Sequence, residues 1–268
     1  MTSNERTILE WYSEKNEDLR ATQSRADNLE FHFTKKAIDK YISSESNVIE
    51  IGCGTGFYGI YCADKCKKYT GVDLTPKNIE IFNEKVSSKN IQNIETMVGN
   101  ITNLANIKDE NFDIVLVLGP MYHLSPENRE LAIIEAKRIC KMGGIIFFAY
   151  INKLGAYLQS GILSFPEHYP NKIANECVLK NGMDDVHPGL FFYTTPIEME
   201  KMAKKHGLNV IKNIGVNYFF NKKQINDMDE EKFNHWLEFS EYLFESERCT
   251  ELSVHSILIC LKSSQTIA

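Results

Sequence analysis

The sequence G-C-G-T-G at residues 52–56 is the segment whose residue types and spacing most clearly predict ligand binding. It follows an apolar run at residues 48–51 that has the character of a buried strand, and a helix-like stretch comes next. Glycines at such a turn let a ligand approach the main chain closely. Asp73 closes the next apolar run, about 20 residues further on, where a carboxylate can accept hydrogen bonds from ribose hydroxyls. The pattern therefore predicts a site for a ligand that contains a ribose.

Two classes of cofactor fit these glycines. Residues 54–59 match G-x-G-x-x-G, the dinucleotide-binding pattern, which is weak evidence when it stands alone. The longer pattern, with Glu50 inside the strand end and Asp73 after the second strand, resembles motif I of the class I S-adenosylmethionine-dependent methyltransferases. Three further features favour the methyltransferase. More than 40 residues of mostly helical character precede the motif, residues 141–147 resemble the family's segment at the fifth strand, and the chain ends in two strands like the family's terminal hairpin.

The resemblance implies a role for individual residues around S-adenosylmethionine, which becomes S-adenosylhomocysteine after transfer. Glu50 supports the glycine loop, Asp73 binds the ribose hydroxyls and Leu74 packs on the adenine. Asn100, where family members more often have Asp, reads the adenine amino group together with Ile101. The implied cofactor-binding residues are Glu50, Gly52, Cys53, Gly54, Gly56, Asp73, Leu74, Asn100, Ile101, Leu118 and Gly119.

The sequence L-G-P-M-Y-H-L at residues 118–124 follows the expected fourth strand, where this kind of fold places its substrate. It departs from the [D/N/S]-P-P-[Y/F/W] motif of enzymes that methylate amino groups of nucleic acids, because Gly119 has no side chain to accept protons and Met121 replaces the second proline. No carboxylate occurs from residue 116 to 125, so we expect no metal. The segment instead resembles a broad group of bacterial small-molecule methyltransferases.

Methyl transfer from a sulfonium is an in-line displacement, and a phenol or ammonium acceptor must also lose a proton. His123 is the candidate base or orienting group, although a histidine after a strand is also often a structural hydrogen-bonding residue. Tyr12, in the N-terminal helical region, is the second catalytic candidate, with a place in the core as its alternative. Tyr122, His168 and His187 are predicted to bind the substrate, and surface positions are the alternative for the two histidines.

Other charged and aromatic residues leave two interpretations open. Arg20, Arg25 and Glu30 form either a hydrogen-bonded cluster that closes a lid or a solvated helix face, and His255 is expected to be structural. The many aromatic residues at 151–195 suggest an apolar or aromatic acceptor, or a methylated amine held by cation–π contact. A loose hydrophobic core accounts for them almost as well.

The elements that must position these residues alternate between strand and helix. Continuous apolar runs are typical of parallel strands buried on both faces, and they predict seven strands, near residues 48–51, 69–72, 94–98, 112–118, 145–150, 208–215 and 254–261. We therefore expect an α/β, Rossmann-like, seven-stranded, mostly parallel sheet with helices on both faces, an N-terminal helical cap and an insertion after the fifth strand. The single methyltransferase domain, residues 1–268, is expected to comprise the cap (1–45), the cofactor-binding core (46–150), a substrate-side insertion (151–195) and a C-terminal part with a helical insertion (196–268).

Composition limits the partners and the compartment. The chain has 268 residues, and its 36 Asp and Glu against 30 Lys and Arg give a net charge of −6, which makes nucleic acid an unlikely partner. Apolar runs of about 18 residues are absent and the N-terminus is polar, so we expect no membrane span and no secretion signal. Seven cysteines are an odd number for a disulfide framework and predict reduced thiols in the cytoplasm, with Cys62 and Cys66 on one helix face.

The sequence therefore predicts a metal-independent enzyme, monomer or homodimer, that transfers a methyl group from S-adenosylmethionine to an oxygen or nitrogen of a small molecule. An RNA or protein methyltransferase is the alternative enzyme. A protein that binds S-adenosylmethionine without catalysing transfer is the alternative from another class.

Overall fold

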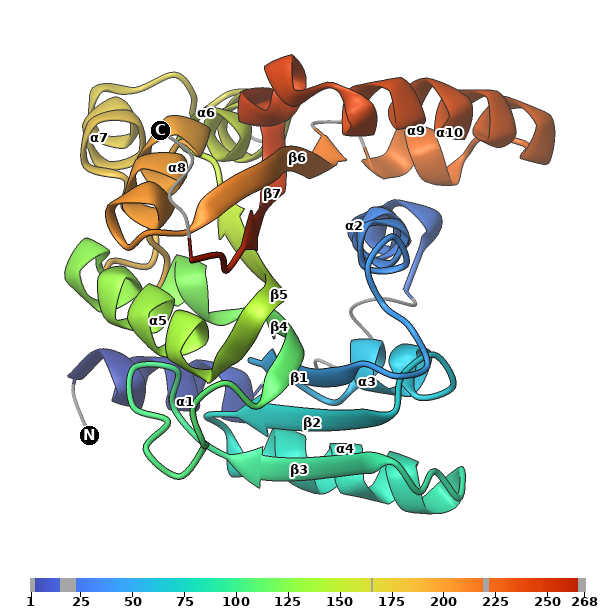
Figure 1. Cartoon of the computed structure of the whole chain (residues 1–268). Coiled ribbons are helices and arrows are strands. Elements are labelled where there is room, and N and C mark those ends of the chain that lie inside the picture. Colours follow the sequence, from blue (N-terminus) through green and yellow to red (C-terminus); the bar gives the residue numbers. More distant parts are fainter. Residues whose placement is uncertain (1–2, 15–22, 165, 219–221, 265–268) are drawn as a thin grey trace.

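Seven strands pair in the order β3-β2-β1-β4-β5-β7-β6 in the computed structural model, which describes residues 3–14, 23–164, 166–218 and 222–264 (Figure 1). The strands are β1 (Asn47–Ile51), β2 (Lys68–Asp73), β3 (Ile94–Val98), β4 (Phe112–Val117), β5 (Cys140–Ile151), β6 (Asn209–Tyr218) and β7 (Ser253–Leu261). Strands β1 to β5 are parallel to one another, and β7 runs antiparallel between β5 and β6. This sheet confirms the predicted mostly parallel α/β fold.

Ten α-helices connect or cover the strands in the described part of the chain. They are α1 (Ser3–Glu14), α2 (Arg25–Ile38), α3 (Phe57–Cys62), α4 (Pro76–Ser88), α5 (Pro126–Ile139), α6 (Lys153–Ala156), α7 (Lys172–Ala174), α8 (Pro196–Lys205), α9 (Lys222–Asn226) and α10 (Glu230–Glu245). None of these helices is long and apolar enough to cross a membrane.

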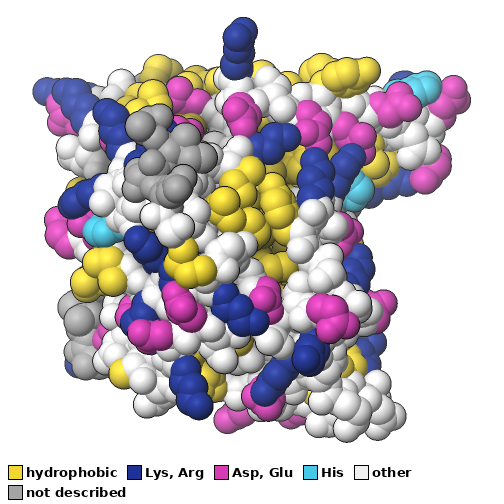
Figure 2. All heavy atoms as spheres, in the orientation of Figure 1, with side chains coloured by type: hydrophobic (Ala, Val, Ile, Leu, Met, Phe, Trp, Pro, Cys, Tyr) yellow, Lys and Arg dark blue, Asp and Glu magenta, His cyan; other side chains and the backbone are white. Residues whose placement is uncertain are grey.

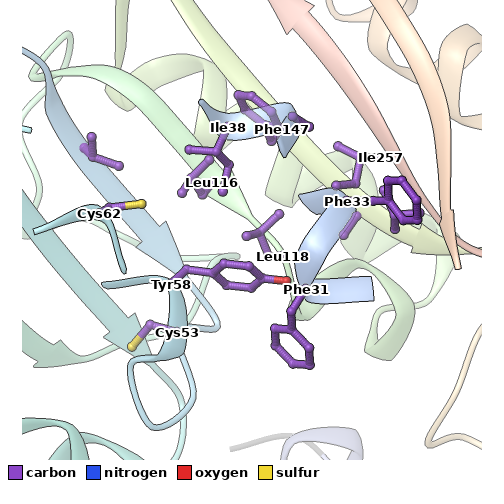
Figure 3. Packing of buried hydrophobic residues seen from close by; sticks show 14 of the residues in the cluster. Phe31, Phe33, Ile38, Cys53, Tyr58, Cys62, Leu116, Leu118, Phe147 and Ile257 are labelled. Carbon is purple, nitrogen blue, oxygen red and sulfur yellow. The ribbon is translucent and has the colours of Figure 1, made fainter. Parts of the chain in front are cut away.

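Alternate residues of the strands face two separate cores, as the twofold repeat of a strand requires. On one face of β4, Leu116 packs with residues of α2, α3 and α4, and Figure 3 shows it beside Ile38 and Phe147. On the other face, Val115 and Val117 pack with α5 and α8. Helices therefore cover both faces, and the carboxyl ends of the parallel strands stay available for a ligand.

The helical cap consists of two helices in the described residues, where the sequence suggested near-continuous helix from about residue 4 to 42. Ser24 begins α2, because its side chain accepts a hydrogen bond from the main-chain N–H of Asp27. In the chain from residue 151 to 195, expected to be irregular, two π-helical segments at Tyr157–Ser164 and Asn175–Asn181 accompany α6 and α7. The expected division of the chain into cap, core, insertion and C-terminal part remains a prediction.

Two local predictions were wrong. Gly143 and Gly144 come directly before the strand expected near residues 145–150 and by composition predict a turn there, but both residues lie inside β5, which begins at Cys140. The pairing register of β4 with β5 shifts between Phe112 and Ile114. The extra residues around the two glycines therefore form an irregularity inside β5 and not a turn before it. Cys66 does not share a helix with Cys62, because α3 ends at Cys62. All seven cysteines are free.

A buried carboxyl lies at the centre of the sheet. Glu50 of β1 is 1% exposed and accepts a hydrogen bond from the hydroxyl of Tyr69 on β2. Burial raises the pKa of Glu50 to about 8; the Asp73 carboxylate adds to this effect, and the Tyr69 hydrogen bond opposes it. Glu50 is therefore mainly protonated at neutral pH and serves as a neutral hydrogen-bonding group inside the core.

Replacing Gly56 with alanine should destabilise the chain more than replacing Gly143. Both glycines have positive φ, +83° and +79°, which costs alanine about 1–2 kcal/mol. A Cβ at Gly56 would also lie 2.0 Å from Cδ2 of the buried Phe82, whereas a Cβ at Gly143 would meet no atom within 4 Å. Overpacking adds about 1–3 kcal/mol for Gly56→Ala. Urea unfolding of both variants measures the difference, and equal losses would contradict the packing assigned to Phe82.

Glu50→Gln should raise the stability of the chain in a pH-dependent way. The unfolded carboxyl ionises near its ordinary pKa of 4.5 and the folded one near 8, so wild-type stability falls as pH rises between these values. The glutamine variant lacks this loss, and its advantage should grow by up to about 1.4 kcal/mol per pH unit from pH 5 to 8. Urea unfolding at pH 5, 6.5 and 8 measures it. A constant difference across this range would mean that Glu50 is ionised in the folded state.

Candidate active site

A cavity of about 740 Å³ lies at the carboxyl ends of β1, β2 and β4. Its volume is within the range of small-molecule and cofactor sites. Each of the eleven residues predicted to bind the cofactor lines it: Glu50, Gly52, Cys53, Gly54, Gly56, Asp73, Leu74, Asn100, Ile101, Leu118 and Gly119. Tyr12, Tyr122 and His123 line it as well. Their roles toward a cofactor or substrate remain predictions, but the fold brings these fourteen residues to one cavity.

The Asp73 carboxylate connects the glycine loop to the start of α4. Its Oδ2 accepts a hydrogen bond from the N–H of Gly54 at 2.8 Å, and its Oδ1 accepts from the N–H of Thr75 at 2.8 Å and from Nδ2 of Asn78 at 3.2 Å. Burial raises the pKa of Asp73, and these three hydrogen bonds oppose that effect. The carboxylate is thus held rigidly at the cavity wall, where two of its neighbours are main-chain amides of the loop and of the α4 N-cap.

The other side of the cavity combines apolar and amide groups. Leu74 and the buried Ile101 contribute apolar surface, and Asn100 contributes a side-chain amide. Oδ1 of Asn100 accepts from the N–H of Thr102 at 3.0 Å, and its Nδ2 donates to Oε1 of Glu5 on α1 at 2.6 Å. Apolar walls with an amide at the edge suit a purine ring.

At the far end of the cavity, the 3₁₀ turn Pro120–His123 follows β4 and carries the two aromatic candidates, both buried. Nε2 of His123 lies 2.8 Å from the hydroxyl of Tyr12 on α1, and Nδ1 lies 2.8 Å from the carbonyl oxygen of Leu190. A carbonyl can only accept, so Nδ1 carries the proton and Nε2 accepts from the Tyr12 hydroxyl. The tautomer of the imidazole therefore follows from its two neighbours.

The end of the insertion is attached to this turn by main-chain and side-chain hydrogen bonds. The N–H of Phe192 donates to the carbonyl of Tyr122 at 2.8 Å. Arg129 of α5, 2% exposed, donates from Nε to the carbonyl of Met121 at 2.7 Å and from Nη2 to the carbonyl of Phe192. The Phe191 ring lies 5.0 Å from the His123 ring. Together these contacts fix the insertion against the His123 turn.

The two histidines of the insertion lie elsewhere. His168 is 72% exposed beside Glu167, and it does not line the cavity. His187 also lies outside the lining; its ring contacts Trp11 edge-on at 4.9 Å between centroids. These positions give the predicted substrate contacts of both histidines no geometric support.

Arg25 and Glu30, two of the three residues of the suggested lid cluster, have different partners among the described residues. Arg25 instead donates to Glu230 and to the carbonyl of Met228, so it joins α2 to the region of α9 and α10. Glu30 lines the cavity and lies 3.6 Å from Nδ1 of His255. Arg20 is outside the described residues.

Several cavity residues were missed from the sequence. Glu5 and Ile8 line the cavity with Tyr12, and their spacing of three and four residues places all three on one face of α1. That spacing could have identified the face. Phe31 of α2 and Tyr58 of α3 also line the cavity, with ring centroids 5.4 Å apart (Figure 3). Their apolar surroundings gave no signal that distinguished them from core residues.

The residues present fit an adenosine-containing cofactor. A side chain at Gly54 would project into open space, so the loop leaves room for a ligand against its main chain. Asp73 can still accept hydrogen bonds, because a carboxylate has about four acceptor positions. Among the described residues, no group of three or more His, Cys, Asp or Glu side chains could hold a metal ion.

Comparisons with known proteins agree with this geometry. Residues 48–144 match a family model described as "Methyltransferase domain". A ribosomal protein L11 methyltransferase of Clostridium botulinum is 33% identical over 163 residues, which are 58% of this chain and 46% of the relative. A ubiquinone biosynthesis O-methyltransferase of Neisseria meningitidis is 26% identical over 174 residues, 64% of this chain and 67% of the relative. The chain thus spans less than half the length of the L11 methyltransferases that it matches.

The crystal structure of a SAM-dependent methyltransferase from Thermotoga maritima shares the fold, with a TM-score of 0.60 and 18% identity over 96% of this chain and 99% of that one. The sheet order, the position of the glycine loop and the family match lead to the same assignment. Residues 48–144 thus match a methyltransferase domain, within a chain that has the fold of the class I S-adenosylmethionine-dependent methyltransferases.

Proposed function

We propose that this chain transfers a methyl group from S-adenosylmethionine to an oxygen or nitrogen of a small molecule, without a metal. The observation that carries the proposal is the hydrogen-bonded pair of Tyr12 and His123, which lies in the same cavity as the eleven residues assigned to the cofactor. One cavity thus holds a cofactor-type loop and a group able to take a proton.

The cofactor supplies an electrophilic methyl group on a sulfonium. Asp73 binds its ribose hydroxyls, Leu74, Asn100 and Ile101 surround the adenine, and the main chain at Leu118 and Gly119 lines the methionine end. α1 covers this arrangement, since Oε1 of Glu5 accepts a hydrogen bond from Nδ2 of Asn100 and the Tyr12 hydroxyl reaches His123. Water is thereby kept from the reacting atoms, and positioning supplies much of the rate.

Tyr12 and His123 remove the proton that the acceptor loses. When the acceptor is methylated, its O–H or N–H proton would pass to the Tyr12 oxygen, while the Tyr12 proton would pass to Nε2 of His123. The proton on Nδ1 of His123 stays hydrogen-bonded to the carbonyl oxygen of Leu190, and this hydrogen bond stabilises the imidazolium that forms. The pair works as a relay because the Leu190 carbonyl keeps Nε2 unprotonated beforehand.

A small acceptor fits the surroundings of the cavity better than RNA. The cavity is lined by residues of α1 and of the His123 turn, and its walls include the rings of Phe31, Tyr58 and Tyr122. On the face shown in Figure 2, Lys and Arg side chains alternate with Asp and Glu over the described surface. RNA binding favours a continuous basic area.

The names of the relatives keep a second candidate open. The C. botulinum relative is named for a protein acceptor, ribosomal protein L11, whereas the N. meningitidis relative is named as an O-methyltransferase of ubiquinone biosynthesis. A protein acceptor would need to place a side chain or terminus beneath α1. We therefore rank a small molecule first and a protein second.

Asp73→Asn should weaken binding of S-adenosylhomocysteine by at least tenfold, or about 1.4 kcal/mol. The amide keeps the shape of the carboxylate but loses its charge and one acceptor oxygen. Isothermal titration measures the affinity. Asp113→Asn is the matched control, because Asp113 also accepts a main-chain N–H bond and lies outside the cavity. An unchanged affinity of Asp73→Asn would refute the assignment of the ribose site.

Methyl-labelled S-adenosylmethionine should label the small-molecule fraction of a bacterial lysate rather than its RNA or protein fraction. Tyr12→Phe should lower this labelling at least tenfold, because proton transfer by a positioned side chain usually contributes at least that much to the rate. The variant should leave the affinity for S-adenosylhomocysteine nearly unchanged. Tyr242→Phe, at a position 78% exposed, is the control.

The three fractions distinguish the alternatives. Label in protein or RNA alone would replace the small-molecule acceptor. Binding of S-adenosylhomocysteine without label in any fraction would favour a non-catalytic protein that binds the cofactor.

A further inference from the structure

Arg129 is a buried cation for which the proposed reaction has no direct use. It is 2% exposed on α5, and burial lowers the pKa of its guanidinium to about 10, with Glu198 acting in the opposite direction. Its two described side-chain partners are carbonyl oxygens, those of Met121 and Phe192. A desolvated charge is a costly way to join two loops, and well-packed apolar residues often do so at no loss of stability. The geometry of the guanidinium must therefore provide something that apolar packing cannot.

The two carbonyls belong to segments that meet at the candidate base. Met121 lies two residues before His123, and Phe192 lies two residues after Leu190, whose carbonyl accepts from Nδ1 of His123. Between them, the N–H of Phe192 donates to the carbonyl of Tyr122 at 2.8 Å. Arg129 thus bridges the two sides of the contact that sets the imidazole tautomer.

We propose that Arg129 is a positioning residue that holds the Leu190 carbonyl against His123 and so keeps the imidazole in its Nδ1–H tautomer, with Nε2 turned to Tyr12. The planar guanidinium suits this role, because its donors are fixed relative to one another and can hold two carbonyls at a set separation. Lysine offers a single flexible ammonium in its place. Arg129 itself does not line the cavity.

This proposal rests on the proposed function for the importance of His123, but its central claim concerns the resting protein. The tautomer of His123 can be read without any acceptor and without turnover. Failure of methyl transfer in the fractionated lysate would therefore leave the claim about Arg129 standing, and loss of the tautomer control would leave the cofactor site standing.

The test is nitrogen NMR of the full chain labelled with ¹⁵N-histidine, in which the two ring nitrogens report the tautomer directly. A His123→Asn variant assigns the signals. Wild type should show His123 as the Nδ1–H tautomer alone. Arg129→Met, which keeps the length of the side chain and removes its donors, should show a mixture of both tautomers. Arg129→Lys should lie between the two. In titrations, both Arg129 variants should bind S-adenosylhomocysteine with an affinity within about twofold, or 0.4 kcal/mol, of the wild-type affinity.

Arg138→Met is the matched control. Arg138 also lies on α5 and also donates to two loop carbonyls, those of Leu104 and Ile107, at 3.0 and 2.8 Å. Neither of these carbonyls belongs to the His123 turn or to residues 190–192, so replacing Arg138 should leave the His123 signals unchanged.

Four outcomes would overturn the proposal. These are a wild-type His123 in the Nε2–H tautomer, a single unchanged tautomer in Arg129→Met, the same mixture in Arg138→Met, or a loss of cofactor affinity that parallels the mixture. The first needs only the wild-type protein and the His123→Asn variant that assigns its signals, so the proposal can be refuted even where the Arg129 variants do not fold.

Discussion

The two hydrogen bonds of the His123 imidazole join three parts of the chain that are far apart in sequence. One reaches Tyr12 on α1 and the other reaches Leu190 near the end of the insertion, while His123 itself follows a central strand. The parallel sheet can only offer an open edge where its strands end. Closing that edge into a cavity requires segments from outside the sheet, and this imidazole is where those segments meet.

Buried polar groups set the rest of the site. Asp73 is surrounded by donors and can hold its charge, whereas Glu50 has one hydroxyl partner and remains largely protonated. Burial raises the pKa of both carboxyl groups, and the larger number of donors around Asp73 opposes this effect more strongly there. Asp73 holds the glycine loop through the N–H of Gly54, and Glu50 is buried in the strand that precedes this loop.

The parts of this arrangement that depend on local pattern could be predicted from sequence. β3 has the predicted bounds of 94–98, and the eleven residues assigned to the cofactor all line one cavity, because the glycines and Asp73 occupy fixed places in a strand–turn–helix unit. Contacts between distant segments could not be predicted in this way. Arg129 has no local signal, since its partners lie 8 and 63 residues away. Gly143 and Gly144 were misplaced because their turn-like composition was weighed without the neighbouring strand.

The position of β7 affects how the chain can assemble. It is the last strand of the described chain, yet it lies between β5 and β6 and pairs with both. While the chain is still being synthesised, the main-chain groups along one edge of β5 and one of β6 have no strand to pair with. Such open edges can pair with other chains. Completion of the sheet, and protection of the nascent protein from aggregation, must therefore wait for residues 253–261 to leave the ribosome.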